Sequence, residues 1–404
     1  MFIYKAGVVG AGAMGAGIAQ VISYSGLPVV LKDVDEAKVQ KGLQIVRQLY
    51  QGRVDKGKMT ASEMEQKLSL VSGSVSWDAF KDCDMAVEAV FENMKVKQQV
   101  FVEMEKALPE SAIMATNTSA LSITHIASAI KRSDKVIGLH FFNPAPAMKL
   151  VEVIPGLQTS RDTLDDTVAF AESLRKFPVR VRECAGFLVN RLLLPYLNEA
   201  AFALQDGSAT AEEIDKAMLD FGLPKGPFAL MDLLGLDVCS DVTMILYDSY
   251  GPRMKPAEIL DEMKKAGCLG VKAGVGFYTY EEGKKADLKA ITEKAQKAAG
   301  GAVKSGFSPE RLLYPMINEA AACLEENVAS PSDIDLAMLA GTGFPQEKGG
   351  PLHLADVIGV DGVLEKLKEF TKRMGPRFWP SPLLKRMVSA QYLGQKTKKG
   401  FFNY

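Results

Sequence analysis

A histidine and a glutamate twelve residues apart are the strongest candidates for acid–base chemistry in this sequence. His140 lies at the end of an apolar run, VIGLHFF, and Glu152 lies in a second apolar run, KLVEVIP, after a Pro-rich turn. Two strands joined by such a turn would bring Glu152 back beside His140, where a carboxylate orients an imidazole and favours its charged form. The alternative is a histidine that is bonded to a backbone carbonyl.

A glycine-rich segment near the N-terminus predicts a nucleotide site. Gly10, Gly12 and Gly15 have G-x-G-x-x-G spacing between a short β-prone run and a helix-prone run. Such glycines allow a tight turn, close approach of the backbone to a pyrophosphate, and close packing of helix on strand. Asp33 ends the next apolar run, where an acidic side chain would accept hydrogen bonds from an adenosine ribose. This order of features predicts NAD, although Lys32 leaves the exclusion of NADP open; a glycine-rich turn without a ligand is the alternative.

The composition is that of an ordinary globular protein. The 404 residues, 47% hydrophobic and 24% charged, can bury a large core and should form two or three domains. A formal net charge of -1 provides no global field for nucleic acid or an anionic membrane. Five cysteines without metal-ligand spacing favour reduced thiols and a cytoplasmic location. We predict no signal peptide, no membrane span and no metal site.

The order of patterns along the chain predicts an α/β domain followed by helical domains. β-rich and helical patterns alternate up to about residue 183, which is typical of a Rossmann-like, doubly wound parallel sheet over residues 1–184. After Gly186 the apolar residues follow helical spacing with little strand signal.

The helical half contains an internal repeat. GFLVNRLLLPYLNEAAFALQDG resembles GFSPERLLYPMINEAAACLEEN at an offset of 120, and the tails match after a small insertion. We therefore predict two tandem all-α domains, residues 185–300 and 301–404, which form a pseudo-twofold pair within the chain. Because the repeat supplies its own partner, a monomer is expected more readily than a homodimer. Asn190 in the first copy corresponds to Glu310 in the second, so a polar role available to one copy is not kept in the other.

With these motifs identified, the chain resembles the 3-hydroxyacyl-CoA dehydrogenase family along essentially its whole length. The matching motifs are VVGAGAMGAGIAQ, AVFENMKVK, ATNTSALSIT, GLHFFNPAPAMKLVEVI, GFLVNRLLLPYLNEA and GVKAGVGFY. The resemblance implies oxidation of an (S)-3-hydroxyacyl-CoA to the 3-oxoacyl-CoA with hydride transfer to NAD, or the reverse. The duplicated C-terminal unit resembles the dehydrogenase part of the multifunctional fatty-acid oxidation enzymes. Since no hydratase domain precedes Met1, a stand-alone dehydrogenase is expected.

The resemblance also implies roles for single residues. His140 would take the proton of the substrate 3-hydroxyl, and Glu152 would hold the imidazole in the useful tautomer. Ser119 would hydrogen-bond the reacting oxygen, and Asn190 would complete the site from the helical half. Arg53 aligns with a basic residue that approaches the CoA phosphates, a role that Lys56 or Lys58 would serve as well.

Further residues match family positions around the ribose and nicotinamide of the cofactor. They are Asp33, Glu92, Lys97, Asn117, Asn143 and Lys272. Taken without the resemblance, Glu92 and Lys97 could be a solvated pair, and Lys272 could be an incidental charge in a Gly-rich turn. Two other functions stay open: a non-catalytic protein that retains the fold, and a dehydrogenase for a free hydroxy acid, which would not need cations for CoA phosphates.

Overall fold

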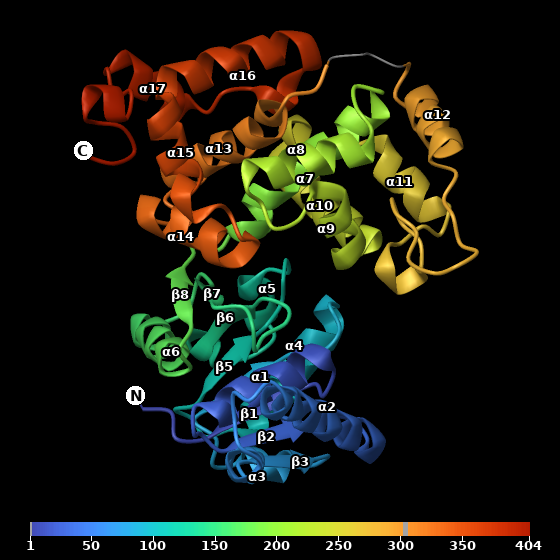
Figure 1. Cartoon of the computed structure of the whole chain (residues 1–404). Coiled ribbons are helices and arrows are strands. Elements are labelled where there is room, and N and C mark those ends of the chain that lie inside the picture. Colours follow the sequence, from blue (N-terminus) through green and yellow to red (C-terminus); the bar gives the residue numbers. More distant parts are fainter. Residues whose placement is uncertain (1, 302–305) are drawn as a thin grey trace. The chain divides into compact units, whose positions relative to one another are not determined.

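The computed structural model describes residues 2–301 and 306–404, which form two compact units, Met1–Phe187 and Leu188–Tyr404 (Figure 1). Residues 302–305, which belong to the third predicted domain, lie outside the described residues. Each unit is described by itself below.

An eight-stranded sheet forms the centre of the first unit, with the order β3-β2-β1-β4-β5-β6-β7-β8. The strands are β1 (Ala6–Val9), β2 (Val29–Lys32), β3 (Val71–Ser74), β4 (Met85–Glu88), β5 (Ile113–Thr116), β6 (Val136–Phe141), β7 (Leu150–Pro155) and β8 (Phe177–Arg180). Every neighbouring pair is parallel except β6 and β7, which are antiparallel. The predicted Rossmann-like sheet is confirmed.

Helices connect the parallel strands. They are α1 (Ala13–Tyr24), α2 (Glu36–Asp55), α3 (Ala61–Leu68), α4 (Met94–Ala107), α5 (Ile123–Ala127) and α6 (Arg161–Ser173). Strands β1, β4 and β5 are buried along their whole length, which explains why their sequences are nearly continuous apolar runs. The charged stretch of residues 34–70 forms α2 and α3, as predicted. The edge strand β3 follows them and was not predicted, because its partly exposed sequence VSGS has no apolar run.

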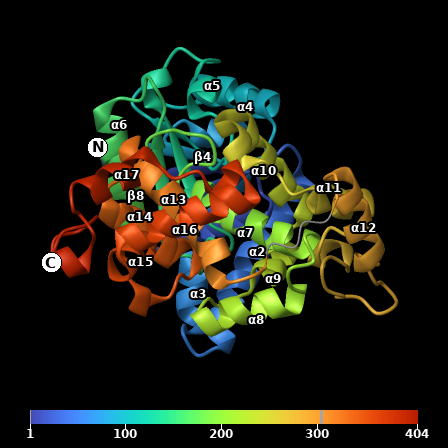
Figure 2. The same cartoon turned by 90° about the horizontal axis from the view of Figure 1, so that it is seen from above.

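The described part of the second unit is helical, with only isolated β-bridges in its loops. The first copy contains α7 (Val189–Gln205), α8 (Ala211–Phe221), α9 (Pro227–Leu234), α10 (Leu236–Tyr250), α11 (Glu258–Lys265) and α12 (Leu288–Ala298). The second copy contains α13 (Pro309–Glu325), α14 (Pro331–Thr342), α15 (Pro351–Ile358), α16 (Val360–Met374) and α17 (Pro382–Ser389). Figure 2 shows α12 beside α11, and α7 packs against α13. The predicted tandem helical copies are confirmed.

Reciprocal ion pairs join the two copies where α7 meets α13. Nε of Arg191 lies 2.7 Å from Oε1 of Glu319, and Nε of Arg311 lies 3.3 Å from Oε2 of Glu199. All four side chains are buried. A second arginine reaches each glutamate: Arg253 contacts Glu319, and the corresponding arginine of the second copy contacts Glu199. Because buried charges are tolerated only when they are paired, each copy requires the other.

Two further findings bear on the class of protein. None of the helices in the described residues is both long and apolar enough to span a membrane. The five cysteines are thiols rather than disulfides in this part of the chain.

Candidate active site

The antiparallel pairing of β6 with β7 places His140 directly opposite Glu152. Nδ1 of His140 lies 2.7 Å from Oε2 of Glu152, and the two residues are 5% and 0% exposed. A carboxylate can only accept a hydrogen bond, so Nδ1 carries the proton and Nε2 is the nitrogen that can take a second one. The buried negative charge stabilises the imidazolium that would then form.

Aromatic rings surround the imidazole within the first unit. The ring centroids of Phe142 and Phe187 lie 4.5 Å and 5.9 Å from that of His140. These rings and the burial of both residues of the pair lower the local dielectric constant. The attraction between imidazolium and carboxylate is therefore stronger than it would be on the surface.

The three glycines after β1 have different surroundings. Gly10 has φ +105°, and a Cβ there would lie 2.5 Å from the carbonyl oxygen of Ala89. A Cβ on Gly15 would lie 1.7 Å from the carbonyl oxygen of Gly10, so this glycine allows α1 to pack on β1. A Cβ on Gly12 would meet nothing within 4 Å. Gly12 is also the N-cap of α1 and makes no side-chain cap, and the N-terminus of a helix is a position that favours an anion such as a pyrophosphate.

Asp33 follows β2 and holds the glycine turn in place. Its Oδ2 accepts a hydrogen bond of 2.8 Å from the amide of Ala11, and its Oδ1 accepts one of 2.7 Å from the amide of Val34. Each carboxylate oxygen keeps a second lone pair for a ribose hydroxyl. The neighbouring Lys32 is buried, and its Nζ lies 4.7 Å from the centre of the Trp77 ring.

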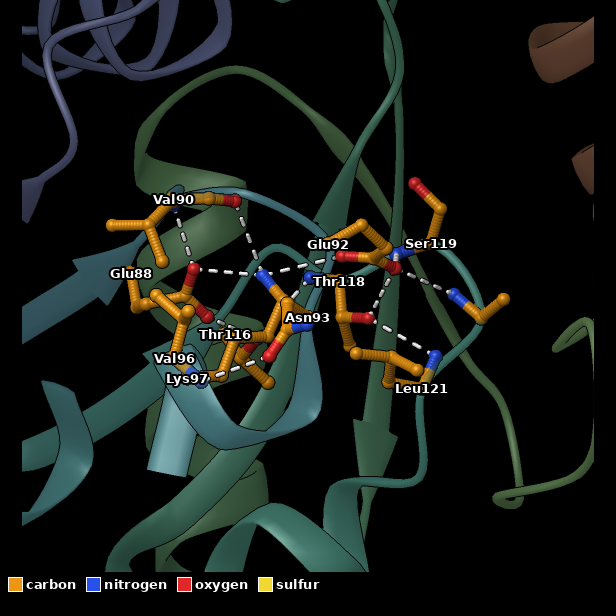
Figure 3. Close-up of polar contacts among 11 residues, drawn as sticks. Glu88, Val90, Glu92, Asn93, Val96, Lys97, Thr116, Thr118, Ser119 and Leu121 are labelled. Carbon is orange, nitrogen blue, oxygen red and sulfur yellow. Dashed lines mark hydrogen bonds and ion pairs between the residues drawn. The ribbon is translucent and has the colours of Figure 1, made fainter. Parts of the chain in front are cut away.

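A buried ion-pair network follows β4 (Figure 3). Glu88 is fully buried, and its Oε1 accepts hydrogen bonds of 2.7 Å from Nζ of Lys97 and from the amide of Val90. Its Oε2 accepts a bond of 2.7 Å from the hydroxyl of Thr116. Nζ of Lys97 also lies 3.2 Å from Oε2 of Glu92. Lys97 is 1% exposed, whereas the side chain of Glu92 is 43% exposed, so solvent reaches the carboxylate of this pair but not the ammonium.

Glu92 in turn fixes the loop after β5 that carries Ser119. Its Oε1 accepts hydrogen bonds from the hydroxyl of Thr118 at 2.6 Å and from the amides of Ser119 at 2.9 Å and Ala120 at 3.3 Å. Burial opposes ionisation, but the charge of Lys97 and these hydrogen bonds hold the pKa of Glu92 below its ordinary value. In Figure 3 the hydroxyl of Ser119 points away from this network.

Two asparagines complete the set in the first unit. Oδ1 of Asn117 accepts a hydrogen bond of 2.7 Å from the amide of Phe141, which ties the ends of β5 and β6 together. Asn143 is exposed in the turn between β6 and β7. The glycine turn, Asp33, Glu92, Ser119 and Asn117 all follow parallel strands, and His140 lies near the end of another. They therefore share the carboxyl edge of the sheet, where open α/β sheets bind ligands.

Glu88 was missed by the sequence analysis. An acidic residue inside the apolar strand MAVE is a signal that a buried cation must lie nearby, and Lys97 is that cation. The partner could not be identified from spacing alone, because the pairing depends on how α4 packs against the sheet.

Asn190 and Lys272 belong to the second unit. Asn190 is the second residue of α7, and Glu310 is the second residue of α13. Lys272 forms an ion pair with Asp237, and Lys396 forms the corresponding ion pair with Asp361 in the second copy. Since both copies contain this pair, it serves the fold of each copy, and a contact of Lys272 with the cofactor stays a prediction.

Arg53 stacks on Tyr24 within the first unit. Its Nη2 donates a hydrogen bond of 2.8 Å to the hydroxyl of Tyr24, and the guanidinium carbon lies 4.3 Å from the centre of the ring. No group of three or more histidine, cysteine, aspartate or glutamate side chains in the described residues is arranged to hold a metal ion.

Comparison with known proteins identifies the family. Residues 5–184 match the 3-hydroxyacyl-CoA dehydrogenase NAD binding domain, and residues 186–280 and 306–404 both match the 3-hydroxyacyl-CoA dehydrogenase C-terminal domain. The chain belongs to the 3-hydroxyacyl-CoA dehydrogenase family. The predicted family and the predicted NAD-binding domain are thus confirmed, and the two C-terminal matches correspond to the two helical copies.

Two curated relatives are longer than this chain. The fatty acid oxidation complex subunit alpha of Shewanella amazonensis is 39% identical over 393 residues, which are 96% of this chain and 55% of that protein. The corresponding Vibrio cholerae subunit is 38% identical over 377 residues, 93% of this chain and 53% of that protein. The chain therefore spans about half the length of these curated relatives.

Two solved structures resemble the chain. The 3-hydroxybutyryl-CoA dehydrogenase of Escherichia coli K12 has a TM-score of 0.87 at 29% identity, and the match covers 97% of this chain and 100% of that chain. The (S)-3-hydroxybutyryl-CoA dehydrogenase of Ralstonia eutropha is 42% identical with a TM-score of 0.68, over 70% of this chain and 100% of that one.

Proposed function

We propose that this protein catalyses the NAD-dependent oxidation of (S)-3-hydroxyacyl-CoA to 3-oxoacyl-CoA, and the reverse reaction. The observation that carries the proposal is the buried hydrogen bond of 2.7 Å between Nδ1 of His140 and Oε2 of Glu152. It lies in the same unit as a glycine turn in which a Cβ on Gly12 would meet nothing within 4 Å. Family membership gives the reaction class, and the pair provides the base that this reaction needs.

The chemistry divides between the cofactor and the side chains. NAD, when bound, accepts the hydride that leaves C3 of the substrate. Nε2 of His140 takes the proton of the 3-hydroxyl as the carbonyl forms, and Glu152 stabilises the resulting imidazolium. The hydroxyl of Ser119 donates a hydrogen bond to the reacting oxygen, and Asn190 from α7 adds a second polar contact to the substrate.

The cofactor is held by groups at the carboxyl edge of the sheet. The glycine turn binds the pyrophosphate, and Asp33 accepts hydrogen bonds from the adenosine ribose. The ammonium of Lys32 is directed at Trp77, so a 2′-phosphate would meet mainly the charge of Asp33, which favours NAD over NADP. The remaining contacts with the ribose and nicotinamide come from Glu92, Lys97, Asn117, Asn143 and Lys272.

The two helical copies bear on the oligomeric state, and the cysteine thiols bear on the cellular location. Residues 1–184 bind the cofactor, residues 185–300 supply Asn190, and residues 301–404 act as the built-in partner of the first copy. The reciprocal ion pairs between the copies favour a monomer, which light scattering would detect. The five thiols favour the reducing cytoplasm.

The test of this function is NADH oxidation with acetoacetyl-CoA, run in parallel with free acetoacetate and with NADPH. We expect turnover only when NADH is combined with the CoA ester. Turnover of free acetoacetate at an equal kcat/KM would instead indicate a hydroxy-acid dehydrogenase. If no acyl-CoA of any chain length reacts while NADH binds, the protein retains the fold without the chemistry.

A further inference from the structure

A cavity of about 490 Å³ lies in the second unit, near the C-terminal end of α13. Its lining includes two aromatic residues and four prolines: Tyr250, Trp379, Pro252, Pro376, Pro380 and Pro382. Because the ring of proline fixes φ, these walls are largely preformed. Trp379 is 61% exposed, although tryptophan is a residue that proteins usually bury. We call this the Trp379 cavity.

The internal repeat shows what covers the corresponding surface of the first copy. Glu325, which lies at the end of α13 and lines the cavity, corresponds to Gln205 at the end of α7. There α12 packs against α7 and α11, as Figure 2 shows for α11. Nε2 of Gln296 on α12 donates a hydrogen bond of 2.6 Å to the carbonyl oxygen of Gln205. A helix of the chain itself therefore covers this end of the first copy.

The second copy repeats the two helices but not their cover. α17 corresponds to α11, and the described residues 390–404 that follow it contain no α-helix. Glu325 and Leu383 are half-buried, whereas their counterparts Gln205 and Ile259 are 3% and 0% exposed. The second copy thus exposes part of a face that the first copy buries under α12.

The exposed face is also more apolar than the covered one. In the first copy Nζ of Lys255 lies 3.0 Å from Oε1 of Glu258. The counterparts of these two residues in the second copy are Trp379 and Pro382. An ion pair is therefore replaced by a large ring and a rigid apolar side chain. Exposed apolar groups within a polar rim are typical of protein–protein contacts, in which tryptophan contributes much of the binding energy.

The polar rim of the cavity is acidic. The side chains of Glu325 and Glu326 are 23% and 46% exposed, and each forms an ion pair with an arginine. α12 carries the exposed lysines Lys289, Lys294 and Lys297 on the side that faces away from its own copy. A helix of this kind could add lysines to the ion pairs of the rim. Such surface contacts contribute little affinity, but they select the orientation of the partner.

We propose that the Trp379 cavity is the docking site for an amphipathic helix of a partner protein that has the pattern of α12. One face of α12 presents Leu288, Ile291 and Ala295, and the opposite face presents lysines. A helix with this pattern inserts its apolar side chains into the cavity and covers Trp379. The helix comes from another protein, because α12 is already packed on its own copy. The proposal does not rest on the dehydrogenase function, since helix binding is measured without turnover.

The test measures binding of a fluorescent peptide of residues 286–300 to the full chain, by fluorescence anisotropy. We expect a Kd of about 100 µM or lower. Trp379→Ala should weaken binding at least about tenfold. This variant should fold normally, because the side chain is exposed and Asn318 donates to the backbone carbonyl oxygen of Trp379. The matched control is Tyr392→Ala, which removes an exposed ring of the same unit that does not line the cavity and should leave the Kd unchanged.

A second peptide tests the apolar face of the helix. Leu288→Ser and Ile291→Ser in the peptide should abolish binding to the wild type. Equal affinity of the original peptide for the wild type, Trp379→Ala and Tyr392→Ala would place the peptide elsewhere and overturn the proposal, as would no binding to the wild type. Self-association of the wild type that Trp379→Ala abolishes, detected by light scattering, would make a second copy the occupant and overturn the assignment to a different protein.

Discussion

The hydrogen bond between His140 and Glu152 determines which imidazole nitrogen is available for chemistry. Nδ1 is engaged with the carboxylate at 2.7 Å, so only Nε2 can exchange a proton with a substrate. Both residues are buried, and neither can rotate away without breaking a hydrogen bond in a medium where water cannot replace it. The cross-strand register of β6 and β7 thus orients the base before any substrate binds.

Glu152→Gln tests the role of the carboxylate. The amide keeps nearly the same shape and can still accept a hydrogen bond, but it no longer stabilises a positive imidazole. We expect kcat to fall by about 10- to 1000-fold while the Kd for NADH stays the same. Steady-state kinetics across pH, with fluorescence titration of NADH, would measure both. A kcat within twofold of the wild type would show that the charge is not needed.

The pairing of these two residues could be predicted from the sequence, because two apolar runs joined by a Pro-rich turn allow few arrangements. The pairing of Glu88 with Lys97 could not be predicted. Lys97 lies nine residues further along and reaches Glu88 only through the packing of α4 on the sheet. The side chain of Asp33 was expected to face a ribose, and its second contact, with the amide of Ala11, depends on the tertiary position of the glycine turn.

At the scale of elements, the glycine turn after β1 contains one glycine that the packing of α1 requires and another that leaves space for a ligand. A Cβ at Gly15 would collide with a carbonyl oxygen of the turn, whereas a Cβ at Gly12 would meet no protein atom. Gly15 therefore serves the packing of α1 on β1, and Gly12 leaves space for a ligand.

Gly12→Ala and Gly15→Ala should therefore change different properties, the first the binding of NADH and the second the stability of the first unit. Gly12→Ala should leave the melting temperature unchanged and weaken NADH binding by at least about tenfold, because the methyl group occupies the space of the pyrophosphate. Gly15→Ala should destabilise the first unit by about 1–3 kcal/mol or more through overpacking. Calorimetric melting and NADH titration of both variants would test this. Equal loss of stability in the two variants would contradict it.

The network of Glu88, Lys97 and Glu92 connects β4, α4 and the loop that carries Ser119. Lys97→Met should be strongly destabilising, by about 3–5 kcal/mol, because it leaves the fully buried Glu88 without a counter-charge. Adding Glu88→Leu to this variant should restore part of the loss. Urea unfolding followed by the fluorescence of Trp77, in chains that also carry Trp379→Phe, would report on the first unit. If Lys97→Met alone is as stable as the wild type, the ion pair of Lys97 with Glu88 does not stabilise the first unit.

The limits of sequence-based prediction at this scale have physical causes. Strands β4, β5 and β6 could be predicted because burial on both faces requires continuous apolar runs. The edge strand β3 is partly exposed and carries serine and glycine, so it has no such pattern. The repeat predicted the two helical copies, but the exchange of arginines and glutamates between them becomes apparent only when α7 is packed against α13.

At the scale of the whole molecule, duplication allows the two copies to differ. Each copy keeps the ion pairs that bind it to the other copy. The loss of one partner would leave the other charge buried without a counter-ion. One residue outside this packing has diverged. Asn190 in the first copy corresponds to Glu310 in the second, at the same position of the helix.

Asn190→Ala and Glu310→Ala should identify the copy that serves catalysis. We expect Asn190→Ala to lower kcat/KM for acetoacetyl-CoA by about tenfold or more, through the loss of a polar contact with the substrate. Glu310→Ala should leave kcat/KM unchanged. Melting temperatures close to the wild type in both variants would exclude a general loss of structure. The reverse pattern of activity would assign the site to the second copy.

The most direct measurement is a single turnover of bound NADH with acetoacetyl-CoA, in the wild type and in His140→Gln. The substitution removes the group that exchanges the proton and keeps the size of the side chain. NADH should bind equally to both proteins, and its oxidation should be slower in the variant by about 100-fold or more. Oxidation at the rate of the wild type, with NADH bound, would contradict the assignment of His140 as the catalytic base.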